Sequence, residues 1–130
     1  MSLKQWEISG LSLPLDLEDL ETMERYEAAF QKMKEEEQKI SRTGKATERI
    51  RAYCDLYLHV FTNLFGEDAA QQIFRDVPLN SGEYEHIYFD FLDFVRKQQT
   101  ESAKIRAEKL LEFAPANRQQ RRKHQKRRRK

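Results

Sequence analysis

The apolar residues between positions 50 and 65 recur at intervals of three or four residues, and a glycine follows them directly. They are Ile50, Tyr53, Cys54, Tyr57, Phe61, Leu64 and Phe65, with Gly66 next in the chain. This spacing puts one apolar stripe along an α-helix, and glycine commonly stands just past a helix C-terminus. The segment therefore predicts an amphipathic helix that has to bury its stripe against other elements.

Three further segments show the same helical period. One runs from about Leu17 to near Ile40, a short one covers residues 67–75, and the last follows Ser81 and stops before Pro115. Ser and Thr are favoured helix caps, so we expect Thr47 to cap the helix of residues 50–65 and Ser81 to cap the last helix.

A different period precedes these helices. Around Gly10, apolar and polar residues alternate, which is the pattern of a half-buried strand. The apolar positions are Trp6, Ile8, Leu11, Leu13 and Leu15. We expect a short hairpin that turns at Ser9-Gly10 and needs helices to pack on.

The predicted fold is mainly α, a small bundle of about four helices in residues 17–114. A short β-hairpin in residues 1–16 precedes it, and a disordered basic tail in residues 115–130 follows it. The residues expected to be buried together are Phe61, Leu64, Phe74, Ile87 and Phe91, with the hairpin packed on them through Trp6 or Ile8.

The last fourteen residues, 117–130, contain nine Lys or Arg and no acidic or apolar side chain. Without them, 15 basic residues remain against 22 acidic ones, so residues 1–116 carry a net charge of −7 in a chain of net charge +2. Like charges without apolar surface predict a disordered tail. Such a tail suits an arm for nucleic acid, a segment that binds the acidic body of its own or a sister copy, or a docking peptide for an acidic partner.

The last predicted helix carries a second apolar stripe beyond the polar segment RKQQTES (96–102). This stripe either caps the end of the bundle or binds a partner, and it leaves a homo-oligomer open as a further use. The predicted partner-binding residues are those of the stripe and the basic tail: Ala103, Ala107, Leu110, Leu111, Ala114, Arg118, Arg121, Arg122, Lys123, Lys126, Arg127, Arg128, Arg129 and Lys130.

The residues that could carry chemistry do not form a recognisable site. Asp55 and His59 lie one helical turn apart, as do His86 and Asp90, but no second cysteine or further ligand pattern supports a metal site. The segment SRTGKAT (41–47) lacks the first glycine and the final Ser or Thr of a phosphate-binding loop. We therefore predict a non-enzymatic protein with no catalytic residue, no cofactor and no metal.

Neither secretion nor membrane insertion is indicated. The N-terminus MSLKQWEISG has no apolar region, and no stretch approaches the roughly 18 apolar residues that span a bilayer. The single cysteine, Cys54, is expected to be a small buried apolar residue in an intracellular protein. We expect a cytoplasmic protein without a membrane partner.

The order of several segments resembles a known family. ISG precedes the first alternating segment, DLEDLETMERYE opens the first helix, FTNLFGEDAAQQIF contains a helix break, and NRQQRR begins the basic end. Together they resemble the tail assembly chaperones that long-tailed phages and prophages of Gram-positive bacteria encode beside the tape-measure gene.

This resemblance implies a small helical protein in the cytoplasm of the bacterial host cell. Its partners would be the tape-measure protein, which it coats and keeps soluble, and the tail-tube protein, whose recruitment it helps. The alternative is a small nucleic-acid-binding protein that uses the basic C-terminal arm, with non-specific contacts to phosphates. The acidic body argues against that alternative, because folded nucleic-acid binders usually spread Lys and Arg over a face of the domain.

Overall fold

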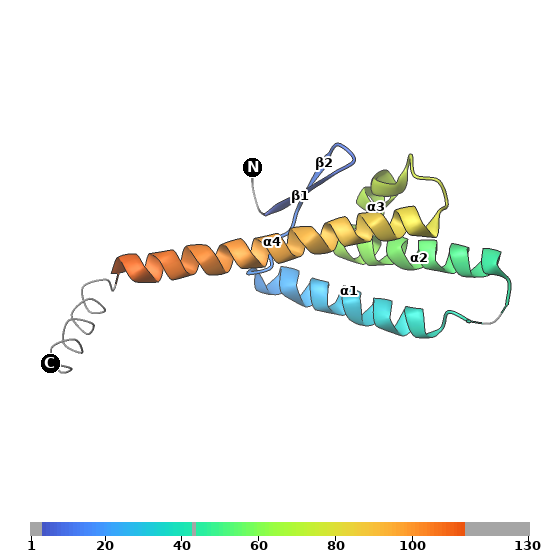
Figure 1. Cartoon of the computed structure of the whole chain (residues 1–130), viewed down its shortest axis with the longest axis horizontal. Coiled ribbons are helices and arrows are strands. Elements are labelled where there is room, and N and C mark those ends of the chain that lie inside the picture. Colours follow the sequence, from blue (N-terminus) through green and yellow to red (C-terminus); the bar gives the residue numbers. More distant parts are fainter. Residues whose placement is uncertain (1–3, 43, 114–130) are drawn as a thin grey trace, which may run out of the picture. The chain divides into compact units, whose positions relative to one another are not determined.

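The computed structural model describes residues 4–42 and 44–113. Within them the chain forms one antiparallel hairpin and four helices (Figure 1). The elements are β1 (Gln5–Ile8), β2 (Leu11–Pro14), α1 (Leu20–Gln38), α2 (Ala46–Phe65), α3 (Glu67–Phe74) and α4 (Ser81–Phe113). The protein is therefore mainly α with an N-terminal hairpin, as predicted. The expected disordered tail lies outside the described residues.

The chain divides into two compact units. The first ends at Val95 and contains the hairpin, α1, α2, α3 and the beginning of α4. The second starts at Arg96, and its described part is the rest of α4. The two units are considered separately below.

The hairpin turns at Ser9 and Gly10, as the sequence predicted. These residues have φ values of 51° and 77°, and two-residue hairpin turns of type I′ need positive φ at both positions. The strands pair with Trp6 opposite Leu13, and the backbone N–H of Leu15 donates to the carbonyl of Lys4 at 2.7 Å. Glycine at the second position adopts this conformation without steric cost.

The core of the first unit forms around one tryptophan. Trp6, 2% exposed, stacks on Phe61 of α2 with ring centroids 5.2 Å apart and meets Phe91 of α4 edge-on, also at 5.2 Å. Its indole Nε1–H donates to Oδ2 of Asp90 at 3.0 Å. The hairpin therefore packs on the helices through Trp6, as expected.

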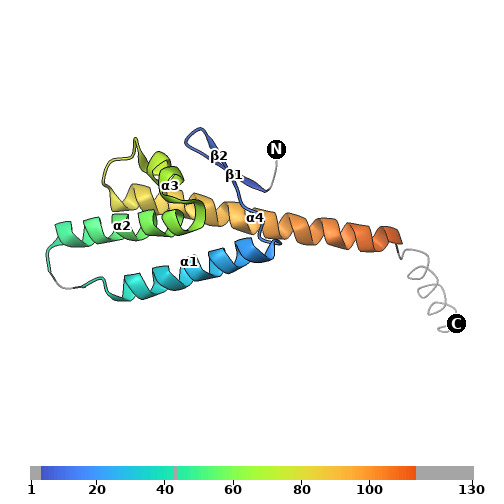
Figure 2. The same cartoon turned by 180° about the vertical axis from the view of Figure 1, so that it is seen from behind.

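Helices α1 and α2 run side by side and are joined at one end by a short connection, as the views from both sides show (Figures 1 and 2). The side chains of α1 that pack in the core are Ala29, which is buried, and Met23, Tyr26, Phe30 and Met33, which are partly buried. Leu20 is 72% exposed and is the first residue of α1, which begins there and not near Leu17 as expected. Asp19 caps this start by accepting the backbone N–H of Thr22 at 3.1 Å.

Two predicted caps are wrong. The residue that precedes α2 is Lys45, which makes no side-chain cap hydrogen bond, and Thr47 lies inside the helix. At α4 the side chain of Asn80 accepts the N–H of Glu83 at 3.1 Å, so Asn80 takes the place expected for Ser81. Asn binds the free N–H groups of a first turn as well as Ser does, and sequence alone did not separate the neighbours.

Most of the predicted core is confirmed. Phe61, Leu64, Phe74 and Phe91 are at most 5% exposed and belong to one cluster. Ile87 is only partly buried, which corrects its placement in the centre of the core. In residues 4–42 and 44–113, no helix combines the length and the apolar character needed to cross a bilayer.

Truncating Phe61 should be costly, because its ring touches the rings of Trp6, Phe74 and Phe91. We expect Phe61→Ala to lower the free energy of unfolding by roughly 3–5 kcal/mol. The matched control is Phe89→Ala, since Phe89 lies on the same unit but is 51% exposed; it should cost less than about 1 kcal/mol. Urea denaturation followed by circular dichroism measures both, and equal costs would contradict the core assignment.

Alkaline pH should destabilise the fold through Tyr88. Burial raises the pKa of Tyr88 from 10.0 to about 12. Between these values the unfolded chain loses the phenolic proton while the folded chain keeps it, so the free energy of unfolding falls as pH rises from 10 to 12. Tyr88→Phe removes the contribution of Tyr88, and the stability difference between wild type and variant should shift in favour of the variant over that range. Burial also raises the pKa values of Tyr26, Tyr57 and Tyr84, and their contributions cancel in this difference. A constant difference in urea titrations at several pH values would contradict this assignment.

Candidate functional site

Every residue of α4 from Ala103 to Phe113 is exposed. Each residue turns an α-helix by about 100°, so Ala103, Ala107, Leu110 and Leu111 fall within roughly 100° around the helix axis. Leu110 is 58% exposed and Leu111 47%. We call these four residues the outer face.

Charged side chains border the outer face on both sides. By helical spacing, Lys104 and Glu108 lie on one flank and Arg106 lies on the other, whereas Lys109 lies near Ile105 on the opposite side of the helix. Lys109 Nζ is 3.8 Å from Oε2 of Glu112, one turn further along. The outer face is therefore an apolar strip within a charged helix, a pattern typical of a surface that binds another helix.

The structure brings together four of the predicted partner-binding residues. The four residues of the outer face share one side of α4, as the spacing predicted. Ala114 and all nine basic residues of the tail lie outside the described residues. Of the two uses left open for this stripe, binding a partner requires exposed apolar side chains, and these four residues are exposed.

A polar hollow lies between the end of α1 and the beginning of α2. It has a volume of about 330 Å³ and is open to solvent. Its lining mixes both signs of charge, with Lys39 and Arg49 among the basic residues and Glu48, Asp55 and Glu36 among the acidic ones. Such mixed lining offers no net charge with which to select a ligand.

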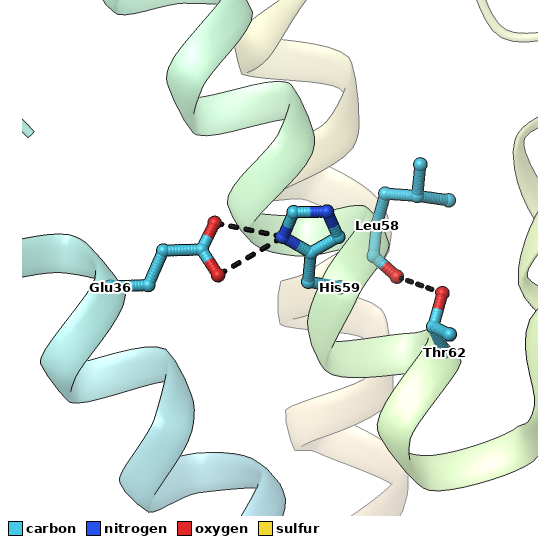
Figure 3. A network of polar contacts seen from close by, with 4 residues as sticks. All are labelled: Glu36, Leu58, His59 and Thr62. Carbon is cyan, nitrogen blue, oxygen red and sulfur yellow. Dashed lines mark hydrogen bonds and ion pairs between the residues drawn. The ribbon is translucent and has the colours of Figure 1, made fainter.

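His59 of α2 points across this hollow to Glu36 of α1 (Figure 3). Its Nδ1 lies 3.0 Å from Oε1 and 2.9 Å from Oε2 of the carboxylate. Spacing along the chain had suggested Asp55, one turn away on the same helix, as the neighbour of His59. The pairing depends on the register between two helices, for which the sequence carries no clear signal.

The contact between Glu36 and His59 links α1 to α2, which gives the imidazole a structural role. The side chains are 34% and 54% exposed, so even with His59 protonated the pair contributes about 0–1 kcal/mol. Within the described part of the chain, no group of three His, Cys, Asp or Glu side chains could hold a metal ion. The outer face is the stronger candidate for a functional site.

Two other residues that could carry chemistry, Asp90 and Cys54, have structural roles. Asp90, considered with His86 as a ligand pair, accepts the hydrogen bond of the Trp6 indole. Cys54 is 1% exposed, and burial, followed by the charge of Asp55, raises the pKa of its thiol. A thiol with a raised pKa is a poor nucleophile, in keeping with the expected role of Cys54 as a small apolar residue.

The sequence profile of a protein family described as a family of unknown function (DUF6673) matches residues 9–125. The chain belongs to this DUF6673 family. The matched range starts at the hairpin turn and includes the whole outer face and much of the basic tail. No curated protein and no solved structure matches the chain.

The exposure of the outer face predicts that charged substitutions there leave the fold intact. We expect the free energy of unfolding of the double variant Leu110→Glu, Leu111→Glu to lie within about 0.5 kcal/mol of the wild-type value, because neither side chain is buried. Leu64→Glu is the contrasting control, since Leu64 is 1% exposed and its replacement should abolish the cooperative transition. Thermal and urea denaturation measure both. A comparable loss in the double variant would place the outer face in the core.

Proposed function

We propose that this protein is a non-enzymatic assembly chaperone of phage tails that binds the tape-measure protein through the outer face of α4. The observation that carries the proposal is the exposure of Ala103, Ala107, Leu110 and Leu111 on one side of a charged helix. The resemblance of the sequence to tail assembly chaperones supplies the identity of the partner. Recruitment of the tail-tube protein is part of the same proposal.

The outer face suits a partner that is long, helical and apolar. An amphipathic helix binds such a partner through apolar residues at spacings of three and four, while its charged side keeps the complex in solution. The four residues of the outer face have this spacing, and Lys104, Arg106 and Glu108 border them. A strip of this size binds each site weakly, which fits a chaperone that is released when the tube assembles.

The basic tail would add electrostatic attraction to the same partner. Its nine Lys and Arg follow the outer face in the sequence after a few residues. Charges of one sign attract an acidic surface over about 8 Å at physiological salt and raise the association rate. In this proposal the tail docks on an acidic surface of the tape-measure protein, of a tail subunit or of a sister copy, in the cytoplasm of the bacterial host cell.

Co-expression with the tape-measure protein tests the outer face. Wild type should co-purify with it, and the double variant Leu110→Glu, Leu111→Glu should lose most of the bound partner. Ile105→Glu is the matched control, because Ile105 is an exposed apolar residue of the same helix on the side opposite the outer face. It should bind as wild type does. Undiminished binding by the double variant would overturn the proposed role of the outer face.

The nucleic-acid alternative is tested with a chain that ends at Ala116. If all nine basic residues contacted phosphates, DNA affinity would fall with salt at a log-log slope of about −6 for single strands and about −8 for duplex. We expect weak, non-specific DNA binding at about 0.15 M salt, and reduced co-purification of the tape-measure protein by the shortened chain. Submicromolar DNA binding that needs the tail, with co-purification unaffected, would favour the nucleic-acid function instead.

A further inference from the structure

The outer face has small residues at one end and large residues at the other. Ala103 and Ala107 come first along α4, and Leu110 and Leu111 follow. A parallel, in-register copy would set leucine against leucine at one end, which holds the helices apart and leaves a gap between the alanines at the other end. An antiparallel copy centred on Ala107 sets Ala103 against Leu111 of the partner, four residues on either side of the centre. Small against large is the arrangement that fills a helix interface at normal packing density.

The flanking charges permit the antiparallel arrangement. Lys104 and Glu108 lie on the same flank, and in antiparallel helices equivalent flanks face each other. With Ala107 at the centre, Lys104 lies within about 3 Å along the axis of the partner's Glu108, and symmetry makes this pair twice. The other flank brings Arg106 toward the Arg106 of the second copy. That repulsion limits the strength of the association.

The position of the basic tail gives a second reason for this orientation. The basic tail follows α4 in the sequence and carries nine like charges. In a parallel pair both tails would therefore start at the same end of the pair, where their charges repel. In the antiparallel pair the two Phe113 positions are about 18 Å apart along the axis, since each residue rises 1.5 Å. This separation exceeds the Debye length of about 8 Å at physiological salt, so repulsion between the tails is largely screened.

We infer that the outer face is an interface between two copies of this chain, in which α4 pairs antiparallel about Ala107 and Ala103 packs against Leu111 of the second copy. The apolar strip is well short of the roughly 800 Å² per partner of a stable interface, so the dimer forms with a dissociation constant of about 10–100 µM. The dimer does not depend on the proposed function. It covers the outer face when no other partner does.

Sedimentation velocity of the full chain between about 5 and 300 µM tests the association, a range chosen to bracket the expected dissociation constant. Wild type should shift from monomer toward dimer, and Ile105→Glu, on the opposite side of α4, should shift alike. Leu110→Glu and Ala107→Glu should each stay monomeric, and circular dichroism checks that they keep the wild-type helix content. The inference is overturned if wild type is monomeric at every concentration, or if Ile105→Glu prevents dimerisation as well as Leu110→Glu does.

Disulfide formation tests the orientation. In a Cys54→Ala background, chains with Ala103→Cys are mixed with chains carrying Leu111→Cys and then oxidised. Antiparallel pairing brings positions 103 and 111 together and holds the two 103 positions about 12 Å apart along the axis, too far for a disulfide. The mixed cross-link should therefore predominate. Efficient cross-linking of Ala103→Cys chains with one another would show parallel pairing and overturn the antiparallel arrangement. A negative result in either experiment would overturn the dimer but would not bear on tape-measure binding, which the co-purification experiment tests separately.

Discussion

The insertion of Trp6 between α2 and α4 is the contact on which the first unit depends. A hairpin with two strands of four residues is not stable alone, and its pairing becomes favourable only with a large apolar side chain buried on helices. The indole ring meets Phe61 and Phe91, and Asp90 accepts its N–H. Asp90 itself is exposed, so its carboxylate supplies the partner for the N–H at the edge of the core while the rings supply the buried apolar contact.

The two parts of α4 use their apolar residues in opposite ways. In the first unit Tyr84, Phe91 and Val95 belong to the buried core. From Ala103 onward every described side chain is exposed, with Leu110 58% and Leu111 47% exposed. The family to which the chain belongs has no described function, so the functional argument rests on this contrast. The proposed function uses these exposed leucines to bind another protein chain.

The sequence predicted the helices of this structure better than it predicted individual contacts. The stripe from Ile50 to Phe65 correctly indicated α2 and its end at Gly66, because helical periodicity is local and Gly66 adopts a φ of 97°. The caps were less certain, since Asn80 and Ser81 are adjacent and both can bind a first-turn N–H. The pair Glu36 and His59 was not predicted, because it depends on how two helices align and not on the spacing within either.

The sequence by itself determined the number, kind and order of the elements, because their periods, turn residues and helix stops act over a few neighbouring positions. It also determined that α4 has two apolar stripes. Only the tertiary structure decided that Phe91 is buried while Leu110 is exposed. Both stripes have helical spacing and apolar side chains, and burial depends on whether other elements supply a surface to pack on. Trp6 and Phe61 supply it for Phe91, whereas Leu110 stays in contact with water.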